Sequence, residues 1–138
     1  MAENYGGDYF YDVLTNDSNV TSKVGTWTDS TDTLHPSIHM SRLVPQIDGS
    51  DNTINFYRTG NVNSADNFFQ TEWSVDCRAK EEYTALDIAT AVRDAINRNF
   101  ASVGGKRYFS TVAILPAIEP ADDADVYNVP VTVTLRRK

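Results

Sequence analysis

The chain has 138 residues, and its 12 Lys and Arg against 19 Asp and Glu give a formal charge of −7 at pH 7. This length suits a single domain, residues 1–138, that buries enough core to fold without cross-links. One cysteine excludes an intrachain disulfide, and no apolar stretch approaches the ~20 residues that cross a bilayer. The first residues predict no signal peptide, and the acidic balance argues against tight binding to a phosphate backbone.

The N-terminal region predicts one helix followed by a long polar segment. Residues 5–15 place four apolar side chains on one helical face, and acidic residues near the start suit the helix dipole. Residues 15–37 are rich in Ser, Thr, Asp and Asn, so we expect a loop that contains one brief strand at 24–27. The apolar residues of the helix are Tyr9, Phe10, Val13 and Leu14.

Three strand candidates occupy the middle of the chain. The first two, at 38–44 and 53–57, flank a turn-forming sequence at 48–52, which predicts a hairpin with a long loop. The third, at 72–79, alternates apolar and polar residues with a period of two, which predicts one buried face and one wet face. Its apolar residues are Trp73, Val75, Cys77 and Ala79.

A second helix is predicted over residues 84–100. Thr84 and Asp87 match a capping box, and Gly104–Gly105 would supply a left-handed stop. An apolar residue recurs every three or four positions, so one stripe of this helix should pack on the apolar face of the preceding strand. The stripe consists of Leu86, Ala89, Val92, Ile96 and Phe100.

Two final strands, at 108–115 and 126–136, are joined by a loop at 116–125 that is rich in Pro and Asp. The element order is therefore α-β-β-β-β-α-β-β. Successive strands and a closing hairpin predict an α+β fold, in which a mainly antiparallel β-sheet carries two helices packed on one face.

Few residues could carry chemistry. His35 and His39 are four apart, but in a strand that spacing separates them by about 13 Å, so one metal ion could not join them. Cys77 lies on the apolar face of its strand, while Asp76 and Arg78 point to the opposite face and cannot activate the thiol. We therefore expect no metal, no other cofactor and no enzymatic activity.

The charge clusters and adjacent aromatics have competing interpretations. Residues 122–125 hold three aspartates, which fit a solvated turn better than a calcium loop because the spacing and glycine of an EF-hand are missing. The basic cluster at 136–138 is typical of a solubilising tail. Phe68–Phe69 cannot both face one side of a sheet, so either one of them is exposed on a partner surface or the pair combines a core residue with a loop anchor.

The order of these features is informative beyond the single motifs. An N-terminal helix and loop precede a strand at 38–42, a strand at 71–79 runs straight into a helix at 84–89, and a strand at 129–135 closes the chain. This pattern, which covers nearly the whole sequence, resembles the tail-terminator or tail-completion (head-tail joining) proteins of tailed bacteriophages. Those proteins are small α+β subunits that form a ring, usually a hexamer. The polar 15–37 segment departs from compact members and leaves another neck-ring component open.

The resemblance implies a virion structural protein of the tail or neck, made in the host cytoplasm. It would stop growth of the tail tube, join the tail to the head connector and leave a lumen for DNA. The expected partners are further copies in a hexameric ring, the tail tube protein and a head-completion or connector protein, with no membrane. The alternative, from another class, is a small non-viral α+β domain that binds a ligand or a peptide at its sheet edge.

In such a ring, loops and sheet edges would make the subunit contacts. Acidic loops would line the channel, because DNA must pass without sticking to its wall. The expected contact residues are Val44, Pro45, Ile47, Phe68, Phe69, Pro116 and Ile118. The expected lumen-facing acids are Asp48, Asp51, Asp122, Asp123 and Asp125.

Overall fold

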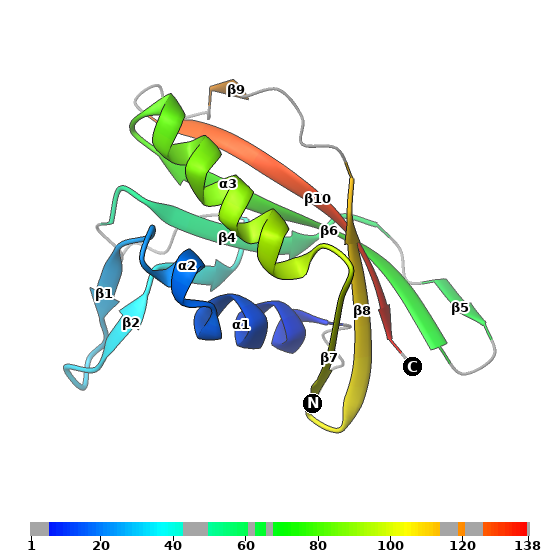
Figure 1. The fold of residues 1–138 in the computed structure, drawn as a ribbon. Helices are drawn as coiled ribbons and strands as arrows, with labels where there is room; N and C mark the ends of the chain where they lie inside the picture. The colour runs from blue at the N-terminus through cyan, green and yellow to red at the C-terminus, as the bar shows by residue number, and fades with distance from the viewer. Residues whose placement is uncertain are drawn as a thin grey trace.

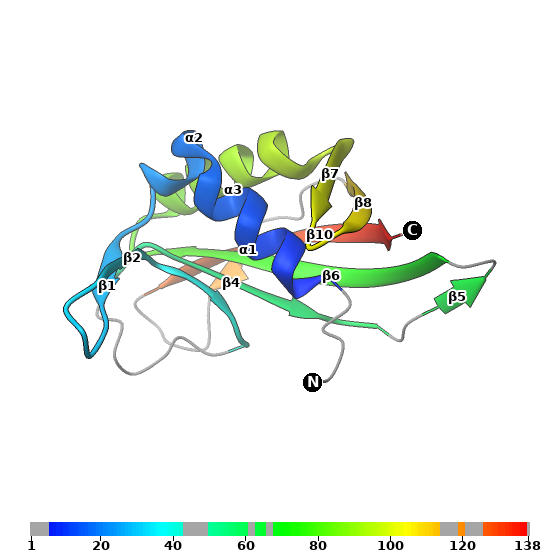
Figure 2. The ribbon, with the colours of Figure 1, turned by 90° about the horizontal axis from the view of Figure 1, so that it is seen from below.

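The computed structural model describes residues 6–42, 50–60, 63–65, 68–113, 119–120 and 126–137. Its helices gather on one face of a long, twisted sheet (Figures 1 and 2), which confirms the α+β class and the mainly antiparallel sheet. The elements are α1 Gly7–Asn16, α2 Ser18–Thr21, β1 Thr26–Thr28, β2 Leu34–Pro36, β3 Ile38–Met40, β4 Thr53–Arg58, β5 Asn63–Ala65, β6 Phe68–Ala79, α3 Glu82–Ile96, β7 Asn99–Val103, β8 Lys106–Val112, β9 Glu119–Pro120 and β10 Tyr127–Arg137.

The sheet is built around two long antiparallel strands, β6 and β10. They pair from Tyr127 opposite Ala79 to Arg137 opposite Phe69. The strand order is β3-β4-β6-β10-β8-β7, with β5 paired to β6 and β9 paired to β10, so β3 and β7 are the two ends of this order. The alternation predicted for residues 72–79 is confirmed on its apolar side, because all four apolar residues of that stretch are buried.

The expected hairpin between the second and third strands is wrong. β3 and β4 pair in parallel, with Ile38 opposite Ile54. The start of β4 is tied to the segment before β3, because the Ile54 amide donates to the Ser37 carbonyl at 2.9 Å. A hairpin would reverse the chain, whereas this pairing requires the chain to return to the same end of the sheet. Turn-forming residues indicate that a turn occurs, but they do not determine the direction of the strand that follows.

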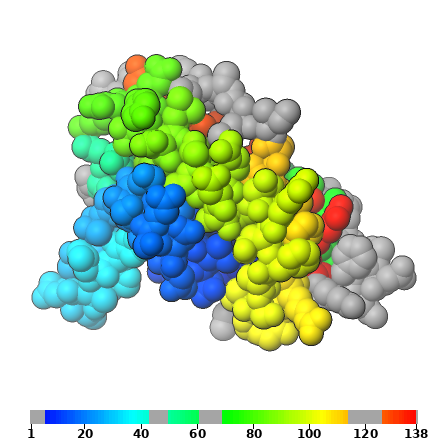
Figure 3. Space-filling view, in the orientation of Figure 1, coloured from blue at the N-terminus to red at the C-terminus, as the bar shows by residue number. Residues whose placement is uncertain are grey.

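The polar 15–37 segment is more ordered than a loop. Asp17 caps α2, a short helix absent from the sequence-based prediction, by accepting from the Asn19 and Val20 amides at 2.9 and 3.1 Å. β1 and β2 then form a separate two-stranded hairpin, with Trp27 opposite His35. This hairpin projects from the body of the molecule beside α2 (Figures 1 and 3).

Helix α1 lies over the sheet as expected, with Tyr9, Phe10 and Leu14 buried. The Phe10 ring lies 5.0 Å from the Trp73 ring on β6. Gly6 precedes the helix with φ 127°, and a Cβ there would collide with the Leu135 side chain, so only glycine fits this entry. The Leu135 side chain on β10 thereby restricts which residue can stand before α1.

Helix α3 covers the centre of the sheet, but its predicted limits were wrong. It begins at Glu82 after Glu81 and has no side-chain cap, so the Thr84–Asp87 capping box is not used. It ends at Ile96. Within these limits, the stripe is confirmed at Ala89, Val92 and Ile96, which are fully buried. Leu86 is 37% exposed and lies at the margin of the stripe.

The predicted last turn of that helix is instead the start of a hairpin. Asn97 leaves the helix with an extended backbone (ψ 123°), Arg98 follows with φ 55°, and Phe100 lies on β7 with 77% of its surface exposed. Gly104–Gly105 has positive φ at both residues and forms the two-residue turn between β7 and β8. Phe100 follows Ile96 by four positions, so a strand residue matched the helical period by coincidence.

Candidate functional site

The only thiol is enclosed in the core. Cys77 is fully buried on β6, and burial, together with the negative charge of Asp76, raises the pKa of its thiol well above the usual range. The described residues contain no group of three or more His, Cys, Asp or Glu side chains that could hold a metal ion. The absence of catalysis and cofactors stays a prediction.

Both histidines lie against the Trp27 ring of the β1–β2 hairpin. His35 on β2 stacks on the Trp27 ring at 4.7 Å, and His39 on β3 contacts the same ring at 5.8 Å. His35 Nε2 lies 2.8 Å from Asp29 Oδ2. Hydrogen bonds from the Thr31 hydroxyl, from His35 and from backbone amides hold the pKa of Asp29 well below its usual range. These contacts stiffen the hairpin.

Most of the expected contact residues lie outside the described residues. Val44, Pro45, Ile47, Pro116 and Ile118 belong to that group, and for Phe68 only the backbone, in β6, is described. Phe69 is half-buried, and the Arg137 guanidinium lies 4.4 Å from its ring centroid. Phe69 is therefore held within its own chain by a cation–π contact.

Of the acidic residues expected to face the lumen, Asp51 alone lies within the described residues. Asp48, Asp122, Asp123 and Asp125 lie outside the described residues. Asp51 is exposed and its Oδ1 lies 3.4 Å from the Lys80 ammonium, which is also exposed. An exposed pair of this kind contributes little to stability, so the carboxylate remains available to solvent.

The basic C-terminus is not a tail at residues 136 and 137. Both arginines lie in β10 and pair with β6 and β8. Arg136 Nε donates to Gln70 Oε1 at 3.1 Å across the strands. The strand predicted at 126–136 already included Arg136, so the interpretation of these two arginines as a tail was wrong, and β10 extends to Arg137.

The sheet face away from the helices is less wet than predicted. Ser74 and Asp76 are each 8% exposed. Asp76 accepts from the Tyr57 hydroxyl at 2.9 Å and from the Ser74 hydroxyl at 2.7 Å, which satisfies both of its oxygens. Asn55 beside it is fully buried, and its side-chain amide has no hydrogen-bond partner among the described residues. Local alternation correctly assigned these residues to the other face, but it could not reveal that this face is covered.

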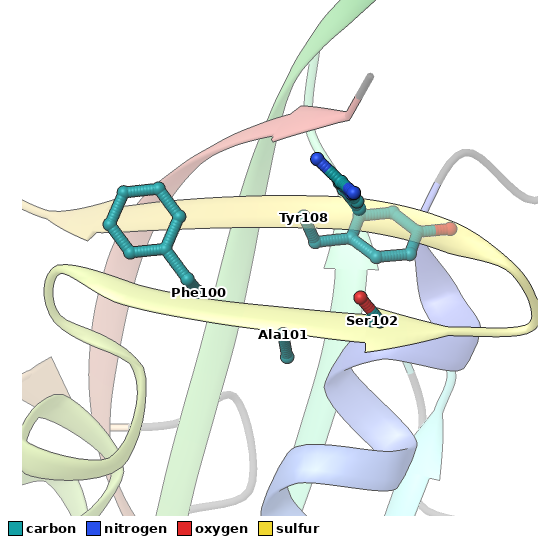
Figure 4. Close-up of a pocket in the computed structure, with 5 residues that line it drawn as sticks. Phe100, Ala101, Ser102 and Tyr108 are labelled. Carbon is teal, nitrogen blue, oxygen red and sulfur yellow. The ribbon is translucent and has the colours of Figure 1, made fainter.

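Sequence reasoning missed a surface on β7 and β8. Phe100 stacks on Phe109 with ring centroids 4.3 Å apart and an interplanar angle of 23°. An open hollow of about 230 Å³ adjoins this stack and is lined by Phe100, Ala101, Ser102, Arg107 and Tyr108. Figure 4 shows Phe100 at one end of the hollow and Ser102 with Tyr108 at the other. The signal available in the sequence was the pair of glycines between two β-prone runs, which is typical of a hairpin.

The fold is shared with solved structures. It matches a chain from the virion of a native gene transfer agent particle with a TM-score of 0.69 and 14% identity, over 99% of this chain and 98% of that one. It matches a second solved chain with a TM-score of 0.59 and 7% identity, over 94% of both. The sequence matches no protein-family model and no curated protein. None of the described helices is long and apolar enough to cross a membrane.

Proposed function

We propose that this protein is a virion structural subunit that forms a ring at the head-proximal end of a phage-type tail tube. The ring would stop tube growth, join the tail to the head connector and leave a lumen for DNA. The observation that carries this proposal is the fold match to a chain of a virion particle, which runs over nearly the full length of both chains. The order of sequence elements favours the tail-terminator position over other places in a particle.

The distribution of chemistry supports an assembly role over an enzymatic one. Among the described residues, the thiol is buried and the histidines stabilise a hairpin, whereas several large apolar residues are exposed. Leu34 is 65% exposed, Tyr83 75% and Phe100 77%, and they lie on different elements. A subunit that contacts its own copies and two other proteins needs several such surfaces.

The charge of the chain suits a DNA channel. Six copies at −7 each would carry about −42 formal charges, and charges within roughly 8–10 Å of DNA act on it at physiological salt. Asp51, whose carboxylate is exposed, is the described member of the expected lumen acids. An acidic wall would repel the phosphate backbone and keep DNA mobile.

The test is to determine the native mass of the chain, alone and with preassembled tail tubes, and to image the mixtures by electron microscopy. We expect a ring of about six copies, in solution or on one end of each tube, and tubes whose growth stops when it is present. A chain that neither forms rings nor binds tube ends would contradict the proposal. Binding elsewhere along a particle neck would identify another neck component.

A further inference from the structure

Charge is divided unequally between two parts of the molecule. Residues 97–113, which include β7 and β8, carry three basic residues and no acidic residue, although the chain as a whole is acidic. Arg136 and Arg137 lie opposite β8 in the sheet and add to that side. Residues 6–36 carry five aspartates and a single lysine. Two copies could therefore attract each other through these unlike regions.

The basic part, residues 97–113, offers a hollow in which another chain can dock. Arg98 and Arg107 are exposed, and neither side chain has a hydrogen-bond or ion-pair partner among the described residues. Arg107 lines the hollow, and Phe100 supplies an exposed aromatic wall that also stacks on Phe109. An aromatic wall with an unpaired arginine suits an apolar side chain next to a carboxylate.

The acidic part, residues 6–36, includes an exposed hairpin tip that can enter such a hollow. At the tip of the β1–β2 hairpin, Asp32 is exposed with φ 61°, and Leu34 two residues later is 65% exposed. Asp29 holds the tip in shape by accepting from the Thr31 and Thr33 amides at 2.8 and 3.1 Å. The tip is therefore preorganised, which lowers the entropy lost when it docks.

We propose that the β1–β2 hairpin of one copy docks in the β7–β8 hollow of the next copy, with Leu34 against Phe100 and Asp32 near Arg107. The β1–β2 hairpin and the strands β7 and β8, which carry the hollow, lie apart on different sides of the molecule in Figure 3, so the contact joins copies head to tail. A heterologous contact of this kind closes into a ring when the rotation between copies allows it. This inference rests on the proposed self-assembly and names its contact.

A second copy fits this surface better than DNA does. A duplex would meet three basic residues in residues 97–113 but also the field of a chain whose net charge is −7. The hollow also offers apolar lining, which contributes to binding a leucine side chain and little to binding a phosphate backbone. DNA binding by the same residues is the competing outcome.

The test uses two variants that break opposite halves of the contact. Leu34→Lys removes the apolar knob and brings a like charge toward Arg107, whereas Phe100→Ser removes the aromatic wall. Matched controls change exposed residues outside both contact surfaces, with Leu86→Lys on α3 and Tyr11→Ser on α1. Self-association of the full chain is measured by analytical ultracentrifugation from micromolar to millimolar concentration, and a short DNA duplex is titrated in parallel.

Each contact variant alone should associate roughly tenfold or more weakly than the wild type, while the controls behave like it. An equimolar mixture of the two contact variants retains one intact contact and should stop at a heterodimer. Contact variants that associate like the wild type, with rings intact, would overturn the inference but leave the proposed function standing. A wild type that stays monomeric, or a Phe100→Ser effect on DNA binding alone, would also overturn it, and location in a particle would then decide the proposed function.

Discussion

One sheet contains both the central strands β6 and β10 and the edge hairpin β7–β8. Its central aromatic residue is buried, whereas an aromatic residue of the edge hairpin is exposed. Trp73 on β6 is 2% exposed and lies against Phe10 from α1, whereas Phe100 on β7 is 77% exposed and stacks on its strand neighbour Phe109. The difference arises from the layer above the strand, because helices cover the centre of the sheet (Figure 2). Side-chain size therefore indicates burial only where a second layer is available.

The largest effect should come from removing the central aromatic residue. Trp73→Ala deletes a side chain that contacts Phe10 and Phe56 and donates its indole N–H to the Thr71 hydroxyl at 2.8 Å. We expect the free energy of unfolding to fall by about 3–5 kcal/mol, measured by urea denaturation followed by circular dichroism. A loss below about 1 kcal/mol would mean that the centre of the sheet is not the hydrophobic core of the protein.

Helix α3 offers the same comparison within one element. Ile96, the last residue of the helix, is fully buried, whereas Leu86 near the start of the helix is 37% exposed. Ile96→Ala should cost about 2–5 kcal/mol, and Leu86→Ala less than about 1 kcal/mol. Urea denaturation of both variants checks the order, and equal losses would place the helix in a different rotation over the sheet.

Tyr9 joins the buried centre to the edge hairpin. Its hydroxyl lies 2.5 Å from the Ser110 hydroxyl on β8 and accepts from Asn99 Nδ2 on β7 at 3.1 Å. Tyr9→Phe should cost about 1–3 kcal/mol because it leaves the buried Ser110 and the partly buried Asn99 with fewer hydrogen bonds.

The same variant should reveal a dependence on pH. Burial raises the pKa of Tyr9, against the smaller opposing effect of its hydrogen bonds to Ser110 and Asn99. The unfolded chain loses this proton near pH 10 while the folded chain keeps it, so the stabilisation is complete below pH 10 and is lost as pH rises toward the folded pKa. The difference in stability between wild type and Tyr9→Phe should narrow above pH 10, and a constant difference would contradict this account.

The smallest effect on stability is expected at the edge. Phe100→Ala should change the free energy of unfolding by no more than about 0.5 kcal/mol, since the side chain already meets solvent. The measurement is the same urea denaturation. A loss comparable to that of Trp73→Ala would show that the aromatic stack supports the fold, and the contrast between centre and edge would fail.

Local periodicity was sufficient for the elements whose two sides differ in burial. The alternation of β6, the stripe of α3 from Ala89 to Ile96 and the apolar face of α1 all follow from which residues need to leave water, a property written along a few consecutive turns or strand positions. The single domain was expected from the length of the chain, and it stays a prediction.

Tertiary structure alone decided features that join distant parts of the chain. The parallel direction of β3 and β4, the cover over Asp76 and the pairing of Phe69 with Arg137 depend on how the chain returns, which no local pattern specifies. Asp51, a predicted site residue, likewise meets Lys80 from the connection between β6 and α3. Phe100 continues the helical period of α3, yet it lies on β7 because the backbone becomes extended at Asn97 and the following residues gain a ladder of hydrogen bonds with β8. That gain exists only once both strands are present, so the exposed surface they form is a property of the folded sheet.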